Sequence, residues 1–342
     1  MTEIKTILRL SIWTMAFWYC AMITGQADEF RVNGPLPART FNPVYLMSLG
    51  QNPHRAVVLS GKEIRTGIDF SYGNLVEFDQ SGYNEVRLDM ELARLQINLA
   101  CGLGRGFETE IQIPFSYGHK GFFDGIVDHY HKSLDLPEGQ RNLVPDDMFT
   151  YKLTQENETF YQLTDMEPGL NDIVLGVRKS IIIEKNNLPG FTCGLRLKFP
   201  TGDSSKGFGS GGFDYALSTA IEKTFNRWHL HLNLDYIGIS GHKNFSNLYR
   251  NEMIAWLTAI EYNISRPVSV IVQIQGSTPM LHGLDITEWD DPPLDLGIGL
   301  GGTHQAKESK KLFFWKWLFF EDLNPNGPSI DISTTFYAGI QL

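Results

Sequence analysis

The stretch RWHLHLNLDYIGIS, Arg227–Ser240, alternates between polar and apolar residues from its first position to Tyr236. A period of two is typical of a β-strand, because successive side chains of a strand point to opposite faces. The stretch therefore predicts a strand with one apolar and one polar face. The apolar face holds Trp228, Leu230, Leu232, Leu234 and Tyr236, and the polar face holds Arg227, His229, His231, Asn233 and Asp235.

The polar face of this strand also has features of a metal site. Imidazole and carboxylate groups are zinc ligands, and a strand would point His229, His231 and Asp235 the same way. At the usual rise of a strand, however, Asp235 lies ~13 Å from His231. A third close ligand is therefore missing, and we expect the His pair to belong to a polar lining that binds no metal.

Segments with the same period of two follow one another along most of the chain, after a proline-rich entry at residues 34–50. Between the segments 86–92 and 95–101 the apolar positions change parity, which predicts a β-bulge near Ala93 and Arg94. The run Leu312–Phe320 is apolar on both parities and is the least secure strand. The regular segments are 64–72, 86–92, 95–101, 107–115, 191–199, 213–221, 268–274, 294–300 and 330–342, with less regular ones at 173–183 and 254–264.

The connections between these segments alternate between short and long. The short ones include FNR and ISRP, and the long ones include TGDSSKGFGSGG and residues 118–171. Tight periplasmic turns opposite long extracellular loops are typical of outer-membrane barrels. We therefore predict an all-β, antiparallel up-and-down transmembrane β-barrel of about twelve strands, with both chain termini at the short-turn end. A soluble β-sandwich or soluble barrel is the alternative.

Composition and the N-terminal residues narrow the class further. The 342 residues carry a formal net charge of -10 without a Lys/Arg cluster, which argues against a nucleic-acid partner. Residues 1–27 have the basic start, apolar core and small residues of a cleaved signal peptide, with an uncleaved anchor as the alternative. We expect residues 28–342 to form a single barrel domain, in which residues 118–171 form a long extracellular or plugging loop. Apolar same-face neighbours favour Cys101 and Cys193 as two buried small side chains, although a disulfide between them is left open.

The polar parity of the predicted strands mixes acidic and basic residues, which would line the lumen of a barrel. Such a lining favours a cross-linked network of ion pairs or a polar conduit with charges of both signs. A plugged lumen that carries nothing is as well supported as a pore. The candidates are Arg65, Glu108, Glu110, Arg178, Arg196, Lys198, Asp214, His229, His231 and Asp235, and Glu222 and Asp295 share their parity.

Motifs for catalysis are absent from the sequence. The loop TGDSSKGFGSGG lacks the order of a phosphate-binding loop, and neither a nucleophile elbow nor an HExxH pattern occurs. We therefore predict no enzyme, no catalytic residues, no cofactor and no metal. A hydrolase at the barrel rim, using His242 or His282, is the least favoured alternative. One amphipathic helix is predicted within the long loop, at Asp124–Pro137.

Several phrases of the sequence together resemble an uncharacterised family of predicted outer-membrane proteins of Gram-negative bacteria, a domain of unknown function. The resemblance implies a barrel in the outer membrane, and it assigns no activity and no functional residues. One departure is the last residue, Leu342, where such barrels usually end in an aromatic residue. The matching phrases are GPLPAR from Gly34, GFFDGIVDHYH from Gly121, LKFPTGD from Leu197 with GSGGFDY after it, RWHLHLNLDY, and EDLNPNGPSIDIS near the end.

The function that these observations favour is a passive channel or uptake route for small solutes. The alternative is a structural or surface-interaction barrel that does not conduct. The expected partners are outer-membrane lipid and lipopolysaccharide, the barrel-insertion machinery and a small-molecule solute. The expected location is the bacterial outer membrane.

Overall fold

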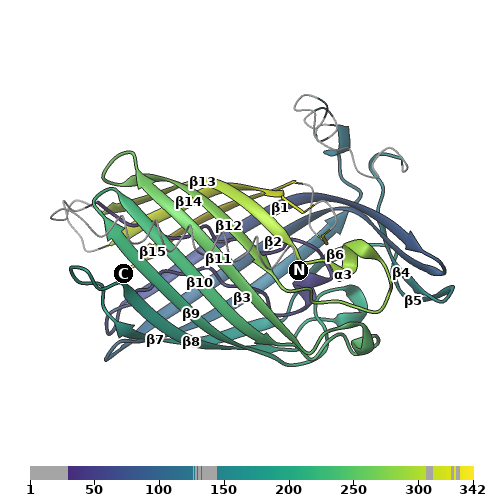
Figure 1. The fold of residues 1–342 in the computed structure, drawn as a ribbon, viewed down its shortest axis with the longest axis horizontal. Coiled ribbons are helices and arrows are strands. Elements are labelled where there is room, and N and C mark those ends of the chain that lie inside the picture. Colours follow the sequence, from purple (N-terminus) through teal and green to yellow (C-terminus); the bar gives the residue numbers. More distant parts are fainter. Residues whose placement is uncertain are drawn as a thin grey trace, which may run out of the picture.

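A computed structural model describes residues 30–125, 127, 129, 132, 145–305, 311–324, 327–328 and 332–342. Within these residues, twelve antiparallel strands form a closed barrel (Figure 1), in which each strand pairs with its neighbours and β1 pairs with β15. The prediction of an up-and-down barrel of about twelve strands is confirmed. The barrel strands are β1 (Ile64–Ser81), β2 (Asn84–Gly104), β3 (Phe107–His119), β7 (Ile173–Ile182), β8 (Gly190–Phe199), β9 (Asp214–Phe225), β10 (Trp228–Gly238), β11 (Glu252–Asn263), β12 (Val268–Ser277), β13 (Leu294–Gln305), β14 (Leu312–Asp322) and β15 (Ile332–Gln341).

The two ends of the barrel differ in their connections. At the short-turn end, residues 226–227 join β9 to β10 and residues 105–106 join β2 to β3. The described chain begins and ends here, since Arg31 N donates to Arg266 O and Leu342 N donates to Ile64 O. At the long-loop end, one connection breaks the predicted alternation, because β1 and β2 meet in the two-residue turn 82–83. These two strands extend beyond the rim of the barrel (Figure 1), so the tip of their hairpin takes the place of a loop.

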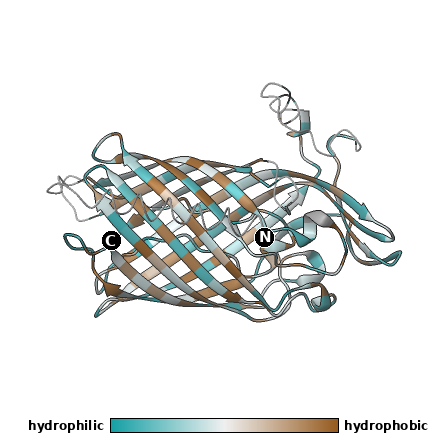
Figure 2. Ribbon diagram, viewed as in Figure 1, coloured by the Kyte–Doolittle hydropathy of each residue, from teal (hydrophilic) through white to brown (hydrophobic). Residues whose placement is uncertain are grey.

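Side chains alternate between the outside and the inside of the barrel along each strand. In β10, Trp228, Leu232, Leu234 and Tyr236 are 37–51% exposed on the outside. The polar set 229, 231, 233 and 235 is 0–1% exposed on the inside. Figure 2 shows this alternation as apolar and polar bands along the strands. The barrel therefore has an apolar outer face and a polar interior.

The bulge predicted near Ala93 and Arg94 is absent, because the register of β1 with β2 is continuous over both strands. Even-numbered positions of β2 face inward throughout. Leu88 and Met90 are 0% exposed at the extended end, whereas Arg94 is 4% exposed inside the barrel. The inner face of β2 therefore changes from apolar to polar along the strand. This change produces the same shift of apolar parity in the sequence as a bulge would.

Residues 30–63, which we call the plug, run inside the barrel. They enter at the short-turn end, rise to the long-loop end, turn at the 3-10 helix η1 (Tyr45–Met47) and descend to β1. On the way up, Asn33 N donates to Glu261, and on the way down Leu59 N donates to Glu108. The plug therefore crosses the lumen twice.

An apolar core, which we call the cap, closes the long-loop end. It joins η1 of the plug to the inner faces of the extended β1 and β2 and to the loops after β10 and β12. Those loops hold the helix α3 (Thr287–Asp290) and the 3-10 helix η4 (Ser246–Leu248). Members such as Val44, Leu153, Met280 and Trp289 are 0–1% exposed. The cap separates the lumen from solvent at this end.

The long connection between β3 and β7 contributes three short strands at the long-loop end. β4 (Thr150–Gln155) pairs with the extended part of β2, β5 (Glu158–Leu163) pairs with β4, and β6 (Met166–Leu170) pairs with β3. The described part of this loop joins the cap, and the plug occupies the lumen. The helix predicted at Asp124–Pro137 lies largely outside the described residues, and the predicted signal peptide lies entirely outside them.

None of the helices in the described part of the chain has the length and apolarity required to cross a membrane. Cys101 and Cys193 are free and partly exposed, so their interpretation as buried side chains is wrong. They share the outer face of the barrel with Leu99 and Leu195.

Candidate functional site

The ten residues predicted to line the lumen lie on the inner parity of their strands. Eight are 0–4% exposed, whereas Arg65 and Glu110 are partly exposed. Six of them form ion pairs with one another: Arg178 with Glu108, Arg196 with Asp235 at 3.0 Å, and Lys198 with Asp214 at 3.3 Å. Lys198 also pairs with Asp172 at 2.7 Å.

Seven of the ten candidates bind the plug directly. The plug forms no strand, so its buried N–H and C=O groups need partners outside a sheet ladder. Lumen side chains supply these partners, and the charged lining therefore acts as a cradle for a non-repetitive backbone. The contacts are Glu108 to Leu59 N, Glu110 to Asn52 Nδ2, Arg178 to Arg55 O, Arg196 to Gly50 O, Lys198 to Met47 O, Asp214 to Leu49 N and Asp235 to Asn52 N, at 2.7–3.3 Å.

His231 connects the two limbs of the plug through two carboxylates. Its Nε2 lies 3.0 Å from Glu261 and its Nδ1 lies 3.3 Å from Glu222. Glu261 accepts hydrogen bonds from the backbone N–H groups of residues 33 and 34 on the rising limb. Glu222 accepts two from Arg55 on the descending limb, at 2.6 and 3.0 Å. His231, the second histidine of the His-x-His pair of β10, therefore helps to hold the plug.

The metal interpretation of that pair gains no support from its contacts. His229 binds Asn263 at 2.5 Å and Thr224 at 3.1 Å. Within the described ranges, no group of three or more His, Cys, Asp and Glu side chains is arranged to hold a metal ion.

Sequence reasoning missed the plug and treated its first half as an entry segment. A usable signal was present, since four prolines at 35, 37, 43 and 53 exclude a central strand. Leu36, Val44 and Leu49 nevertheless are apolar, and a non-strand segment must bury such side chains elsewhere. They are 0–1% exposed.

β14 is apolar on both faces because its inner face also packs on the plug. Leu318 and Phe320 form a small core with Leu36 and Ala38 of the rising limb. On the outer face, Phe313, Trp317 and Phe319 are 45–48% exposed. The irregular pattern that made this strand the least secure prediction thus has a structural cause.

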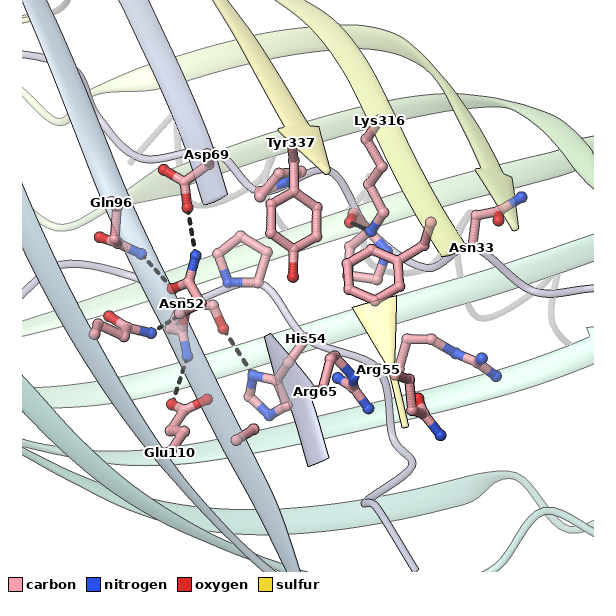
Figure 3. A pocket seen from close by; sticks show the side chains of 18 of the residues that line it. Asn33, Asn52, His54, Arg55, Arg65, Asp69, Gln96, Glu110, Lys316 and Tyr337 are labelled. Carbon is pink, nitrogen blue, oxygen red and sulfur yellow. Dashed lines mark hydrogen bonds between the residues drawn. The ribbon is translucent and has the colours of Figure 1, made fainter. Parts of the chain in front are cut away.

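A cavity of about 660 Å³ lies between the plug and the wall formed by β1, β2, β3, β14 and β15 (Figure 3). This volume falls within the roughly 300–1,000 Å³ of small-molecule sites. The lining reaches the short-turn end at Ser60, Glu63 and Gln341, and it includes Phe41 from the cap. The cavity therefore runs upward from the short-turn end and stops below the cap.

The lining of this cavity is richer in positive than in negative side chains, although the whole protein carries a net charge of -10. A cavity with walls of one dominant sign concentrates ions of the opposite sign. The cationic residues are Arg31, Arg39, Arg55, Arg65, Arg94, Arg178 and Lys316, against the acidic Glu63, Asp69, Glu108 and Glu110.

His54 of the plug faces the cavity in its neutral form. Its Nδ1–H donates to Asn52 O at 2.7 Å, because a carbonyl oxygen can only accept. Its Nε2 has no hydrogen-bond partner among the described residues. Burial lowers the pKa of His54 to about 3, so the ring is uncharged near neutral pH.

The rim histidine His242 has a structural role in its loop. Its Nε2–H donates to Ser204 O at 3.0 Å, its Nδ1 accepts from Asn244 N at 3.2 Å, and its ring stacks on Phe245. Both ring nitrogens are therefore engaged, which leaves neither for proton transfer to a substrate.

A family model described as "Protein of unknown function (DUF3187)" matches residues 10–312. The chain belongs to the DUF3187 family. The resemblance drawn from the sequence phrases is thereby confirmed. No match to this DUF3187 chain was found among curated proteins.

Among solved structures, the DUF3187 chain is similar to the crystal structure of the COG4313 outer membrane channel from Pseudomonas putida F1. The identity is 14%, the TM-score is 0.55, and the match covers 85% of this chain and 100% of that chain. A Pseudomonas aeruginosa FadL homologue matches at 9% identity with a TM-score of 0.37, over 92% of this chain and 95% of that chain. At 14% identity, the likeness to the COG4313 channel shows a shared barrel fold.

Proposed function

We propose that this DUF3187 protein is an outer-membrane channel for small solutes, held closed at rest by its own plug. Solute would pass when the plug moves away from the cavity and the cap. We infer no catalytic role, and the two engaged nitrogens of His242 support this inference.

The apolar outer face supports the membrane location. Phe70, Leu234 and Trp317 are 46–49% exposed on three different strands, and a belt of such side chains is unfavourable in water. Lipid and lipopolysaccharide would cover it, as around other transmembrane barrels. A cleaved signal peptide at residues 1–27 and assembly by the barrel-insertion machinery of a Gram-negative cell belong to the same proposal.

The observation that carries the proposal is the plug with its adjoining cavity. Wall side chains alone fill the interior of a barrel of about eight strands, and a barrel of twelve strands is wider. Here the lumen holds a separate segment, whose lower half is bound by polar contacts such as Arg55–Glu222 and Asn52–Glu110. Water can replace such polar contacts, so the lower half of the plug is suited to leave the lumen and to return to it.

A second candidate is a barrel for surface interaction that does not conduct. The cap favours it, because it closes the long-loop end, where Tyr83 and Phe122 are 71% and 64% exposed. Exposed aromatic side chains are common at protein interfaces. Conductance separates the two candidates.

The test is single-channel recording in planar bilayers. The wild type is compared with a triple variant in the plug, Leu36→Ala, Leu49→Ala and Arg55→Ala, which leaves the wall unchanged. Loss of two buried side chains and one partly buried ion pair destabilises the plugged state by several kcal/mol, and each 1.4 kcal/mol changes the ratio of released to plugged protein about tenfold. We expect rare openings in the wild type and at least tenfold more open time in the variant.

A matched control is Val57→Ala, also in the plug, because this side chain is 46% exposed and is a member of neither described apolar core. It is expected to record like the wild type. Heat-modifiable gel migration checks that every variant remains a folded barrel. Silent bilayers for folded wild type and folded triple variant alike would reject the channel in favour of the surface barrel.

A further inference from the structure

We propose that the cavity beside the plug binds an organic carboxylate. Its carboxylate meets Arg65, Lys316 and Tyr337, and its apolar body lies against the inner face of β14. This inference names a solute class for the proposed channel and rests on that proposal for its biological meaning. Binding itself requires no conduction.

Three neighbouring strands bring these polar groups together. Lys316 of β14 lies opposite Tyr337 of β15 in the ladder, and Tyr337 lies opposite Asp69 of β1. The Tyr337 ring leans along β1, however, because a Cβ atom placed on Gly67 would lie 2.9 Å from Tyr337 Oη. Arg65 is the next inward residue of β1. Figure 3 shows Tyr337 and Lys316 extending toward the side of the cavity where Arg65 lies.

The plug brings a further cation to the same place. Lys316 Nζ donates to Pro35 O at 2.6 Å and lies 3.8 Å from a Cβ atom placed on Gly34. The side chain of Arg55 lies against the same glycine. The absence of a side chain at residue 34 therefore leaves room for two cationic side chains beside the cavity.

The donors of Arg65, Lys316 and Tyr337 are largely unused, whereas Arg55 is paired with Glu222. Over the described ranges, the side chains of Arg65 and Tyr337 form no hydrogen bond or ion pair, and Lys316 uses one of its three donors. Deeper in the cavity, Arg94 is 4% exposed, and its Nη1 has no hydrogen-bond partner within the part of the chain that the structure describes. Unpaired cations away from bulk water are unfavourable, and an anion in the cavity would satisfy them.

The acidic residues of the lining are already engaged. Glu108 pairs with Arg178 and accepts from Leu59 N. Glu110 accepts from Asn52, Asp69 accepts from Asn98 at 2.7 Å, and Glu63 accepts from Ser60 N at 2.8 Å. Among the described residues, no carboxylate forms an ion pair with Arg65 or Lys316.

The walls next to the cations are apolar. Phe314 and Tyr337 have ring centroids 5.4 Å apart, and Pro35, Pro37 and Phe320 also line the cavity. An inorganic anion gains nothing from such walls, whereas the ring of an aromatic carboxylate buries apolar surface there. Arg and Lys bind a carboxylate through charge-assisted hydrogen bonds. Benzoate combines both features and is the probe of choice.

The test is isothermal titration calorimetry on the whole protein in detergent micelles. Benzoate is compared with benzamide, which has the ring without the charge, and with acetate, which has the charge without the ring. We expect benzoate to bind at least about tenfold more tightly than either, the equivalent of ~1.4 kcal/mol. Equal binding of benzoate and benzamide, or of benzoate and acetate, would overturn the inference without any variant.

The residues are tested with Arg65→Gln/Lys316→Met, which removes two charges and keeps most of the side-chain volume. Its matched control is Arg105→Gln/Lys185→Met, at two exposed positions of the short-turn end that do not line the cavity. We expect at least about tenfold weaker benzoate binding in the first and unchanged binding in the second. Unchanged binding in a folded Arg65→Gln/Lys316→Met protein would overturn the site.

The outcomes separate this inference from the proposed function. A plug-weakened protein that conducts but binds no benzoate overturns the site and leaves the channel standing. A protein that binds benzoate but never conducts supports the site and contradicts the channel.

Discussion

The guanidinium of Arg196, whose side chain is 2% exposed, serves two elements at once. It pairs with Asp235 of β10 at 3.0 Å and donates to Gly50 O of the plug at 2.9 Å. Removing one partner of a buried ion pair leaves the other charge uncompensated, which costs more than the pair contributes. At the scale of single residues, the lumen charges thus join the wall to the plug.

The substitution Arg196→Met is expected to lower the free energy of unfolding by about 3–5 kcal/mol, because Asp235 is left as a buried unpaired carboxylate. Urea unfolding in lipid vesicles, followed by tryptophan fluorescence, measures the change. Arg105→Met, at an exposed turn, is the control and should stay within about 0.5 kcal/mol of the wild type. A loss for Arg196→Met no larger than that of the control would show that the pair is not buried as described.

His54 makes the plugged state sensitive to acid. Burial holds its pKa at about 3, with Arg178 and Arg196 adding repulsion, whereas an exposed histidine titrates near 6.5. The released plug therefore binds a proton more readily than the plugged one. The stabilisation of the plugged state is complete above about pH 6.5 and is lost as pH falls from there toward about 3. Over that range the ratio of released to plugged protein rises by up to about tenfold per pH unit.

We expect open time in bilayers to rise about tenfold or more between about pH 7.5 and about pH 5. His54→Gln, which cannot take up a proton, is expected to reduce that rise. An equal response to pH in the wild type and in His54→Gln would assign the effect to the lumen carboxylates instead.

At the scale of elements, periodicity predicted the barrel strands because their two faces meet different surroundings. The same rule misled for β2, where the inner face itself changes from the apolar cap to the polar lumen. A change of surroundings along one face and a bulge give the same sequence pattern, and register decides between them. The plug has no period at all, so a search for periodicity could not find it.

The two faces of β2 are expected to respond differently to truncation. Leu88 is 0% exposed in the cap, so Leu88→Ala should cost about 2–5 kcal/mol of unfolding free energy. Leu95 is 39% exposed on the outer face, and Leu95→Ala should cost less than about 1.5 kcal/mol. Vesicle unfolding measures both, and equal costs would contradict the inward direction of Leu88.

At the scale of the whole molecule, the sequence was sufficient for the barrel, and its period of two assigned the ten lumen candidates to one face of their strands. Which groups those residues bind was not predictable, because many of the partners are backbone atoms of a segment far away in the chain. Asp214 and Leu49, for example, meet only after β9 and the plug are placed in one lumen. The cavity is likewise a property of the closed barrel with its plug, since its lining comes from both.

The plug can be fixed in place by one disulfide. A Cβ atom placed on Gly190, at the start of β8, would lie 3.5 Å from the Cβ of Ala56 in the plug. That separation fits the roughly 3.5–4.5 Å of disulfides. With Cys101 and Cys193 replaced by serine, Ala56→Cys/Gly190→Cys should form this bond under oxidising conditions, and the single-cysteine variants serve as controls.

The most direct test of a movable plug is the conductance of this disulfide protein, with Leu36→Ala and Leu49→Ala added to weaken the plug. Recordings from the same preparation are compared before and after a reducing agent is added. The plugged-channel account predicts few openings in the oxidised protein and at least about tenfold more open time after reduction. Open time that is the same before and after reduction, in a protein shown to form the disulfide, would contradict it.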